Sequence, residues 1–215
     1  ILNDSIFLLE VTGNQSSPYT SLKINVGKTD IPYGAPPNGR QAHVDSMATN
    51  DARVLGAFIE NDKIQFVGNT IDTLSGYAAI YHGFVTDLNG TPVFTGNILA
   101  DDSLDFGYPN IAYTGVNPGN RQSVIGVNHT SPERNPGISA LTYNEDGSYS
   151  DLVSLKEAES DVNRLNGYER WGDYFGIQRK YNEPGKTWCA GFYGRSGSNF
   201  TWVSEIITSY EPLTN

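Results

Sequence analysis

The chain has 215 residues, a formal net charge of −10, 12% aromatic residues, 23 glycines, 11 prolines and one cysteine. The negative charge repels nucleic acids and anionic lipids, and no apolar run approaches the roughly 20 residues that a membrane-spanning helix needs. Many short strands joined by tight turns are typical of this glycine, proline and aromatic content.

The first predicted element is a β-hairpin within residues 1–27. Residues 5–11 and 21–26 are short apolar runs separated by a polar, turn-forming stretch. A connection rich in glycine and proline follows, and it carries Arg40 and His43.

Residues 46–100, 106–157 and 170–210 read as three similar units with a period of about 60 residues. Each unit opens with a similar apolar segment, followed by a polar turn, a second apolar run, a loop and a third run. The first two units have a fourth strand, whereas the last one ends without it. His82 falls inside a predicted strand, where a structural role is expected.

Two turns in the first two units share a pattern of Asp or Asn, two residues, glycine, and then threonine or serine. They span residues 87–91 and 144–148, and Gly90 and Gly147 are expected to supply the positive φ of a hairpin turn. The one candidate helix, residues 154–165, is short, so at most one or two turns are predicted there.

A repeat of about 60 residues built from four short strands is typical of the blades of a β-propeller. The predicted fold is therefore an all-β propeller of four-stranded antiparallel blades. Because a hairpin and about three blades cannot close a ring, we expect this chain to be the C-terminal part of a larger propeller. Its expected partner is the N-terminal remainder of the propeller, as a separate cleaved chain or as another stretch of the same polypeptide.

The chain also resembles a known family. Residues 87–91 and 144–148 look like degenerate Asp-box turns of sialidase-type propellers, and residues 169–178 resemble the Arg-Trp-Gly-Asp-Tyr-Ser-Gly segment of large secreted bacterial propeller proteins. The Ser-x-Asp-x-Gly register of the Asp box is not kept. This resemblance implies an exported bacterial propeller, at the cell surface or outside the cell, and does not fix a reaction.

In propellers, the loops between successive blades share one face with the loops between the second and third strands of each blade, and ligands usually bind there. The residues that we expect on this loop face as ligand-binding candidates are Arg40, His43, His129, Arg134, Arg170, Trp171 and Arg195. Guanidinium groups and flat rings suit sugars or carboxylates. Trp171 also fits a packing role between blades, and Arg170 an internal salt bridge.

Asp101, Asp102 and Asp105 could coordinate calcium, because hard cations take several oxygen ligands, but they also fit a solvated acidic turn. No other cofactor or metal site is expected. Cys189 alternates with Trp188 and Ala190, as a small buried side chain on a strand would.

Two functions remain open. The favoured one is a non-catalytic propeller that binds glycan or protein through its loop face, or serves as an extracellular scaffold. The alternative is a sialidase-like glycoside hydrolase, which needs a nucleophile, an acid and an arginine cluster. The catalytic candidates are Tyr108 or Tyr174 as nucleophile and Asp173 as acid, with Arg40, Arg134 and Arg195 for the cluster, and no motif brings nucleophile, acid and arginines together.

Overall fold

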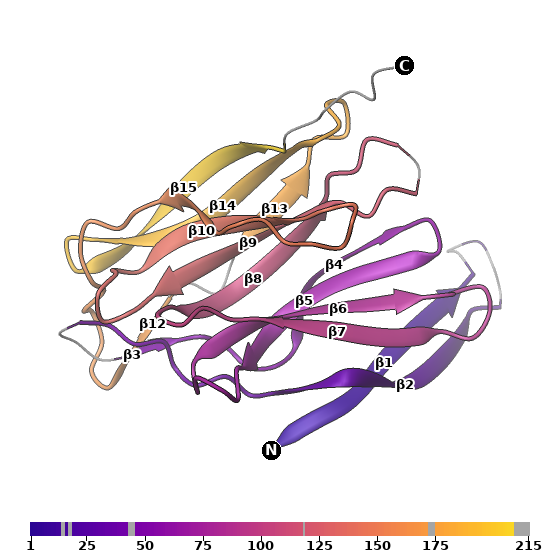
Figure 1. The fold of residues 1–215 in the computed structure, drawn as a ribbon, viewed down its shortest axis with the longest axis horizontal. Helices are drawn as coiled ribbons and strands as arrows, with labels where there is room; N and C mark the ends of the chain where they lie inside the picture. The colour runs from indigo at the N-terminus through magenta and orange to yellow at the C-terminus, as the bar shows by residue number, and fades with distance from the viewer. Residues whose placement is uncertain (14–15, 17–18, 43–45, 118, 172–174, 209–215) are drawn as a thin grey trace.

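A computed structural model describes residues 1–13, 16, 19–42, 46–117, 119–171 and 175–208. Every regular element in these ranges is a β-strand, which confirms the predicted all-β class. In this part of the chain no helix is long and apolar enough to cross a membrane. The sheets are stacked in chain order, from β1 and β2 at one end of the molecule to β15 at the other (Figure 1).

Each of the larger sheets is antiparallel, with every strand paired to the next along the chain, and two of them have four strands as predicted. The first sheet is a hairpin of β1 (Leu2–Thr12) and β2 (Ser21–Gly34), so β2 continues beyond residue 27. The second contains β4 (Val54–Glu60), β5 (Lys63–Ile71), β6 (Ala78–Thr86) and β7 (Val93–Leu99). The third contains β8 (Asp105–Tyr113), β9 (Ser123–Thr130), β10 (Gly137–Tyr143) and β11 (Val153–Lys156). The last contains β13 (Gly176–Arg179), β14 (Lys186–Arg195) and β15 (Ser198–Ile207).

The turn between β6 and β7 differs from the prediction in which residue takes positive φ. Asp87, not Gly90, has φ 57°, and its carboxylate accepts the backbone N–H of Thr91 at 3.0 Å. Aspartate tolerates this conformation because its side chain bonds nearby amides. Glycine is needed at position 90 for space, since a Cβ there would lie 2.5 Å from the Asp87 carboxylate. In the turn between β10 and β11, Gly147 has φ 87°, as expected.

Three apolar clusters fill the spaces between successive sheets. Phe66, Tyr81 and Phe94 pack against the hairpin, with Ile6 and Leu8 on its inner face. The cluster between the two four-stranded sheets contains Val67, Ile80, Leu104, Phe106, Ile111, Ile125, Val127 and Leu141. The cluster between the second four-stranded sheet and the last sheet includes Ile138, Phe175 and Cys189. Each interior sheet is thus buried on two faces.

Two connecting segments pair with each other, although about 120 residues separate them in the sequence. β3 (Ser46–Ala48) and β12 (Tyr168–Arg170) form a short parallel ladder. Nearby, the Gln41 side chain bonds both the N–H and the C=O of Val162. Residues 154–165 form no helical turn: the segment begins within β11, and the backbone of Val162 is bonded to Gln41.

Candidate functional site

The loop between β7 and β8 and the loop between β9 and β10 border a surface cleft of about 640 Å³. We call it the loop cleft. Both loops belong to the face on which the sequence predicts a binding site. Hydroxyl, carboxylate and guanidinium groups line the cleft together with two leucines; its residues are Asp101, Ser103, Leu104, Ser131, Glu133, Arg134 and Leu152.

Asp101 shapes one wall of the cleft. Its Oδ1 accepts hydrogen bonds from the Ser103 N–H and hydroxyl, both at 2.8 Å, and from the Leu104 N–H at 3.0 Å. Partial burial raises the pKa of this carboxyl, but the hydrogen bonds outweigh it and the net pKa is lowered. Asp101 is therefore an ionised, fixed acceptor at the cleft.

Arg134 shapes the opposite wall and is paired with Glu157. Its Nε lies 3.2 Å from Glu157 Oε2, and its Nη2 donates to Oε1 of the same carboxylate. These bonds lower the pKa of Glu157 to about 2. A bidentate pair fixes the plane of the guanidinium group, so Arg134 presents an oriented cation to the cleft.

Arg40 lies beside the cleft and is held by Asp105, which is buried. The Arg40 Nε is 2.6 Å from Asp105 Oδ2, and the Arg40 N–H donates to the same oxygen at 3.0 Å. Its Nη2 donates to the Ser103 carbonyl at 3.0 Å, so Arg40 touches the cleft wall. The guanidinium carbon lies 3.4 Å from the centre of the Tyr77 ring.

The three aspartates considered for calcium do not converge. The Asp101 carboxylate accepts hydrogen bonds from its own turn, and Asp102 is exposed. One carboxylate oxygen of Asp105 accepts from Arg40, and the other accepts from the Ala78 N–H at 3.0 Å. Among the described residues, no three His, Cys, Asp or Glu side chains are grouped to hold a metal ion. The carboxylate oxygens of Asp105 serve the fold instead.

His129 is fully buried, contrary to its expected place on the ligand-binding surface. Its Nδ1 lies 2.8 Å from the Ser139 hydroxyl, and its Nε2 has no hydrogen-bond partner among the described residues. Burial, and to a smaller extent the nearby Arg134, lower the pKa of His129 to about 4. The ring is neutral near pH 7 and lies beneath the surface because β9 is covered on two faces.

Trp171 and Tyr108 are also core residues rather than surface groups. Trp171 is 0% exposed and Tyr108 is 5% exposed, and they belong to one cluster with Ile138 and Phe175. Tyr108 sits at a β-bulge with φ 53°, where its N–H donates to Asn69 Oδ1 at 2.9 Å. Neither ring is available to a ligand at the surface, because the last sheet packs over this region.

Arg195 lies at the end of β14 and is not among the residues that line the loop cleft. Its Nε is 3.1 Å from Glu159 Oε2, and its guanidinium carbon is 5.6 Å from the centre of the Phe200 ring. Arg170 closes β12, where its carbonyl accepts from the Asn199 amide at 2.6 Å. His43, Asp173 and Tyr174 lie outside the described residues.

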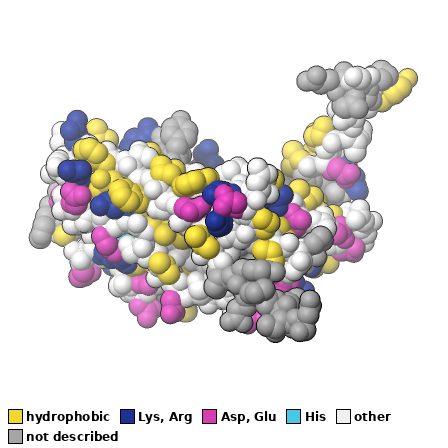
Figure 2. Space-filling view, turned by 90° about the horizontal axis from the view of Figure 1, so that it is seen from above, with side chains coloured by type: hydrophobic (Ala, Val, Ile, Leu, Met, Phe, Trp, Pro, Cys, Tyr) yellow, Lys and Arg dark blue, Asp and Glu magenta, His cyan; other side chains and the backbone are white. Residues whose placement is uncertain are grey.

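The structure therefore brings Asp101 and Arg134 to one cleft, with Arg40 beside it. Sequence reasoning missed their partners Glu157 and Tyr77, which come from separate segments and leave no signal in the sequence. It also missed two half-exposed rings, Phe200 beside Arg195 and Trp202 beside Lys156. On the face drawn in Figure 2, basic and acidic side chains likewise lie next to each other, with apolar side chains between them.

Comparisons of this chain with protein-family models, with curated proteins and with solved structures find no match.

Proposed function

We propose that this chain is part of a secreted or cell-surface β-propeller that binds glycan, without turnover, through the loop cleft. The observation that carries the binding function is the cleft itself, which the fixed Asp101 acceptor and the oriented Arg134 cation line together with Leu104 and Leu152. Sugars offer hydroxyl groups to such polar side chains and C–H faces to apolar ones.

The propeller part of the proposal is supported by how the sheets pack. Each four-stranded sheet meanders from its first strand to its fourth, and the first strands contact one another, β4 with β8 and β8 with β13. Radial repetition of four-stranded sheets around first strands is the propeller arrangement. The resemblance at residues 169–178 is the basis for proposing export.

The state of the arginines favours binding over hydrolysis. Arg40, Arg134 and Arg195 each pair with a different carboxylate, those of Asp105, Glu157 and Glu159. A sialidase-like site instead needs several arginines gathered on one substrate carboxylate. Tyr108, the catalytic candidate that the structure describes, is buried. Glycoside hydrolysis therefore stands as the alternative outcome of the test.

The test measures binding of sialylated, neutral and uronic-acid-containing oligosaccharides by calorimetry, together with their hydrolysis. We expect Arg134→Ala to weaken binding at least about tenfold, since it removes a charge-assisted bond to the ligand. Arg53→Ala is the matched control, because Arg53 also pairs with a carboxylate at the surface but lies outside the cleft. Equal loss in both variants, binding of peptides alone, or turnover of a sialoside or aryl glycoside would each contradict the proposal.

A further inference from the structure

β1 is an edge strand with an unpaired side. Its one hydrogen-bonded neighbour among the described strands is β2, and residues 5–12 pair with β2 without interruption. In an antiparallel pair, every second residue of an edge strand directs its N–H and C=O away from the partner. The N–H and C=O of Ser5 are bonded to the side chains of Asn3 and Tyr33. Beyond Ser5, β1 therefore presents a row of backbone donors and acceptors that no other described strand pairs, an arrangement that natural proteins normally cover or interrupt.

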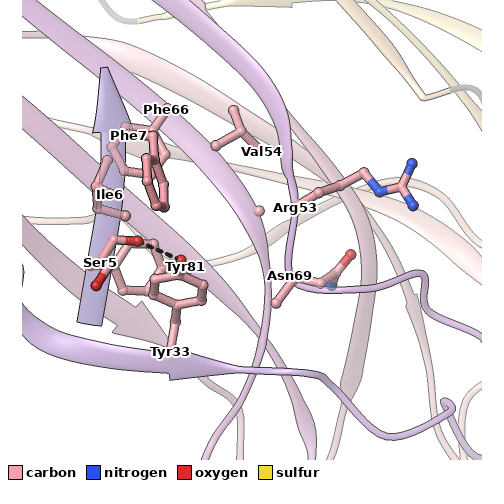
Figure 3. A pocket seen from close by; sticks show the side chains of 11 residues that line it. Ser5, Ile6, Phe7, Tyr33, Arg53, Val54, Phe66, Asn69 and Tyr81 are labelled. Carbon is pink, nitrogen blue, oxygen red and sulfur yellow. Dashed lines mark hydrogen bonds between the residues drawn. The ribbon is translucent and has the colours of Figure 1, made fainter. Parts of the chain in front are cut away.

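A pocket of about 220 Å³ lies directly beside this edge (Figure 3). Figure 3 shows the rings of Tyr33, Phe66 and Tyr81 grouped next to β1, with Val54 across from them. The phenol groups are already bonded, Tyr33 to the Ser5 carbonyl at 2.8 Å and Tyr81 to Thr29 at 2.6 Å. The pocket thus offers mainly apolar ring surface.

The pocket continues an existing interface. On one face of the second sheet, β4, β5 and β6 are all packed against β8. On the other face the hairpin contacts this sheet mainly between β2 and β7, and Val54 at the start of β4 is 54% exposed. Between the other sheets, the first strand of one sheet packs against the first strand of the next, β4 against β8 and β8 against β13. On the hairpin side of the second sheet, no strand of the hairpin packs against β4 in this way.

We propose that the β1 edge and this pocket together seat an extended strand of another polypeptide segment, with apolar side chains at alternate positions. The strand hydrogen-bonds to β1, and the alternation of a strand directs every second side chain into the pocket between Phe66, Tyr81 and Val54. Its remaining side chains join the exposed outer face of the hairpin, formed by Phe7, Leu9, Val11, Leu22, Ile24 and Val26.

This inference rests on the propeller part of the proposed function and not on the loop cleft. Glycan binding at the cleft with no strand at β1 would overturn the inference alone. A strand at β1 with no glycan binding would overturn the binding function alone.

The probe is a short peptide of alternating threonine and valine with a lysine at each end, titrated into the labelled chain and followed by NMR. We expect saturable shifts at residues 5–11 and around the pocket, with slowed amide exchange at every second residue of β1. Two further peptides are N-methylated, one at the valines and one at the threonines. One of them should lose binding, since one set of amides faces β1.

Val54→Lys places a charge at the pocket and should weaken peptide binding at least about tenfold. Val93→Lys is the matched control, since Val93 is 50% exposed on β7 and lies outside the pocket. The proposal would be overturned by NMR shifts away from β1 and the pocket, by slowed exchange of consecutive rather than alternate β1 amides, or by equal binding of all three peptides. Dimerisation by light scattering that Val54→Lys abolishes would assign the edge to a second copy of the chain instead.

Discussion

At Asp105, one buried carboxylate connects three separate segments. It begins β8, bonds the backbone of Ala78 at the start of β6, and pairs with Arg40 in the connection after β2. The side chain of Asp105 is 1% exposed, whereas that of Arg40 is 33% exposed. Removal of the carboxylate would leave a buried amide without its acceptor and a partly buried cation without its partner.

We therefore expect Asp105→Ala to lower the free energy of unfolding by about 3 kcal/mol, measured by urea denaturation. Asp51→Ala is the control, because the Asp51–Arg53 pair is largely exposed and should contribute little to stability. Similar losses in the two variants would show that Asp105 has no special structural role.

At the scale of elements, the hairpin and the second sheet depend on one close approach. A Cβ at Gly27 on β2 would lie 1.9 Å from a ring atom of Phe94 on β7, so the ring of Phe94 fills the space that a side chain would need. This contact explains why β2 packs flat against β7. The packing depends on glycine for space and not for backbone conformation.

Gly27→Ala should destabilise the chain by about 1–3 kcal/mol, because the Phe94 ring must move in a packed layer. Gly176→Ala on β13 serves as the control, since a Cβ at that position meets open space. Thermal unfolding of both variants checks the expectation. A melting temperature of Gly27→Ala within a degree of that of the unmodified chain would contradict the prediction.

At the scale of the whole molecule, a buried polar network joins the two four-stranded sheets. Ser123 on β9 donates to Gln65 Oε1 at 2.9 Å, and His82 Nε2 lies 3.1 Å from the same oxygen. Because that oxygen only accepts, Nε2 carries the proton, and Nδ1 accepts from the Tyr149 hydroxyl at 2.8 Å. The amide of Asn97 donates to Tyr149. His82 thus has the structural role predicted for it.

Burial lowers the pKa of His82 from 6.5 to about 3, so the folded chain holds the ring neutral while the unfolded chain protonates it below pH 6.5. This stabilisation is complete above pH 6.5 and is lost as the pH falls toward 3, by up to roughly 5 kcal/mol. Urea denaturation between pH 4 and pH 8 should show this slope. Because buried His129 contributes a similar slope, His82→Gln should reduce the slope by about half and not abolish it. An unchanged slope in the variant would contradict the assignment.

The sequence predicts the strands, their antiparallel order and the turns well, since these follow from the alternation of apolar residues and from Asx and glycine positions. No comparable sequence pattern indicates which residues contact each other between sheets. Trp171 and His129 occur in polar loop-like contexts, yet the sheets on both sides bury them. Arg40 and Asp105 are likewise far apart in the chain, so their pairing could not be predicted from spacing.

The sequence by itself thus determined an all-β chain, its repeat and the loops that carry Arg40, Asp101 and Arg134. Only the tertiary structure decided that Asp101 and Arg134 line one cleft with Arg40 beside it, that each arginine has its own carboxylate, and that the edge of β1 adjoins an apolar pocket. The physical reason is that strand formation depends on residues two positions apart, whereas burial and ion pairing depend on which sheet faces which.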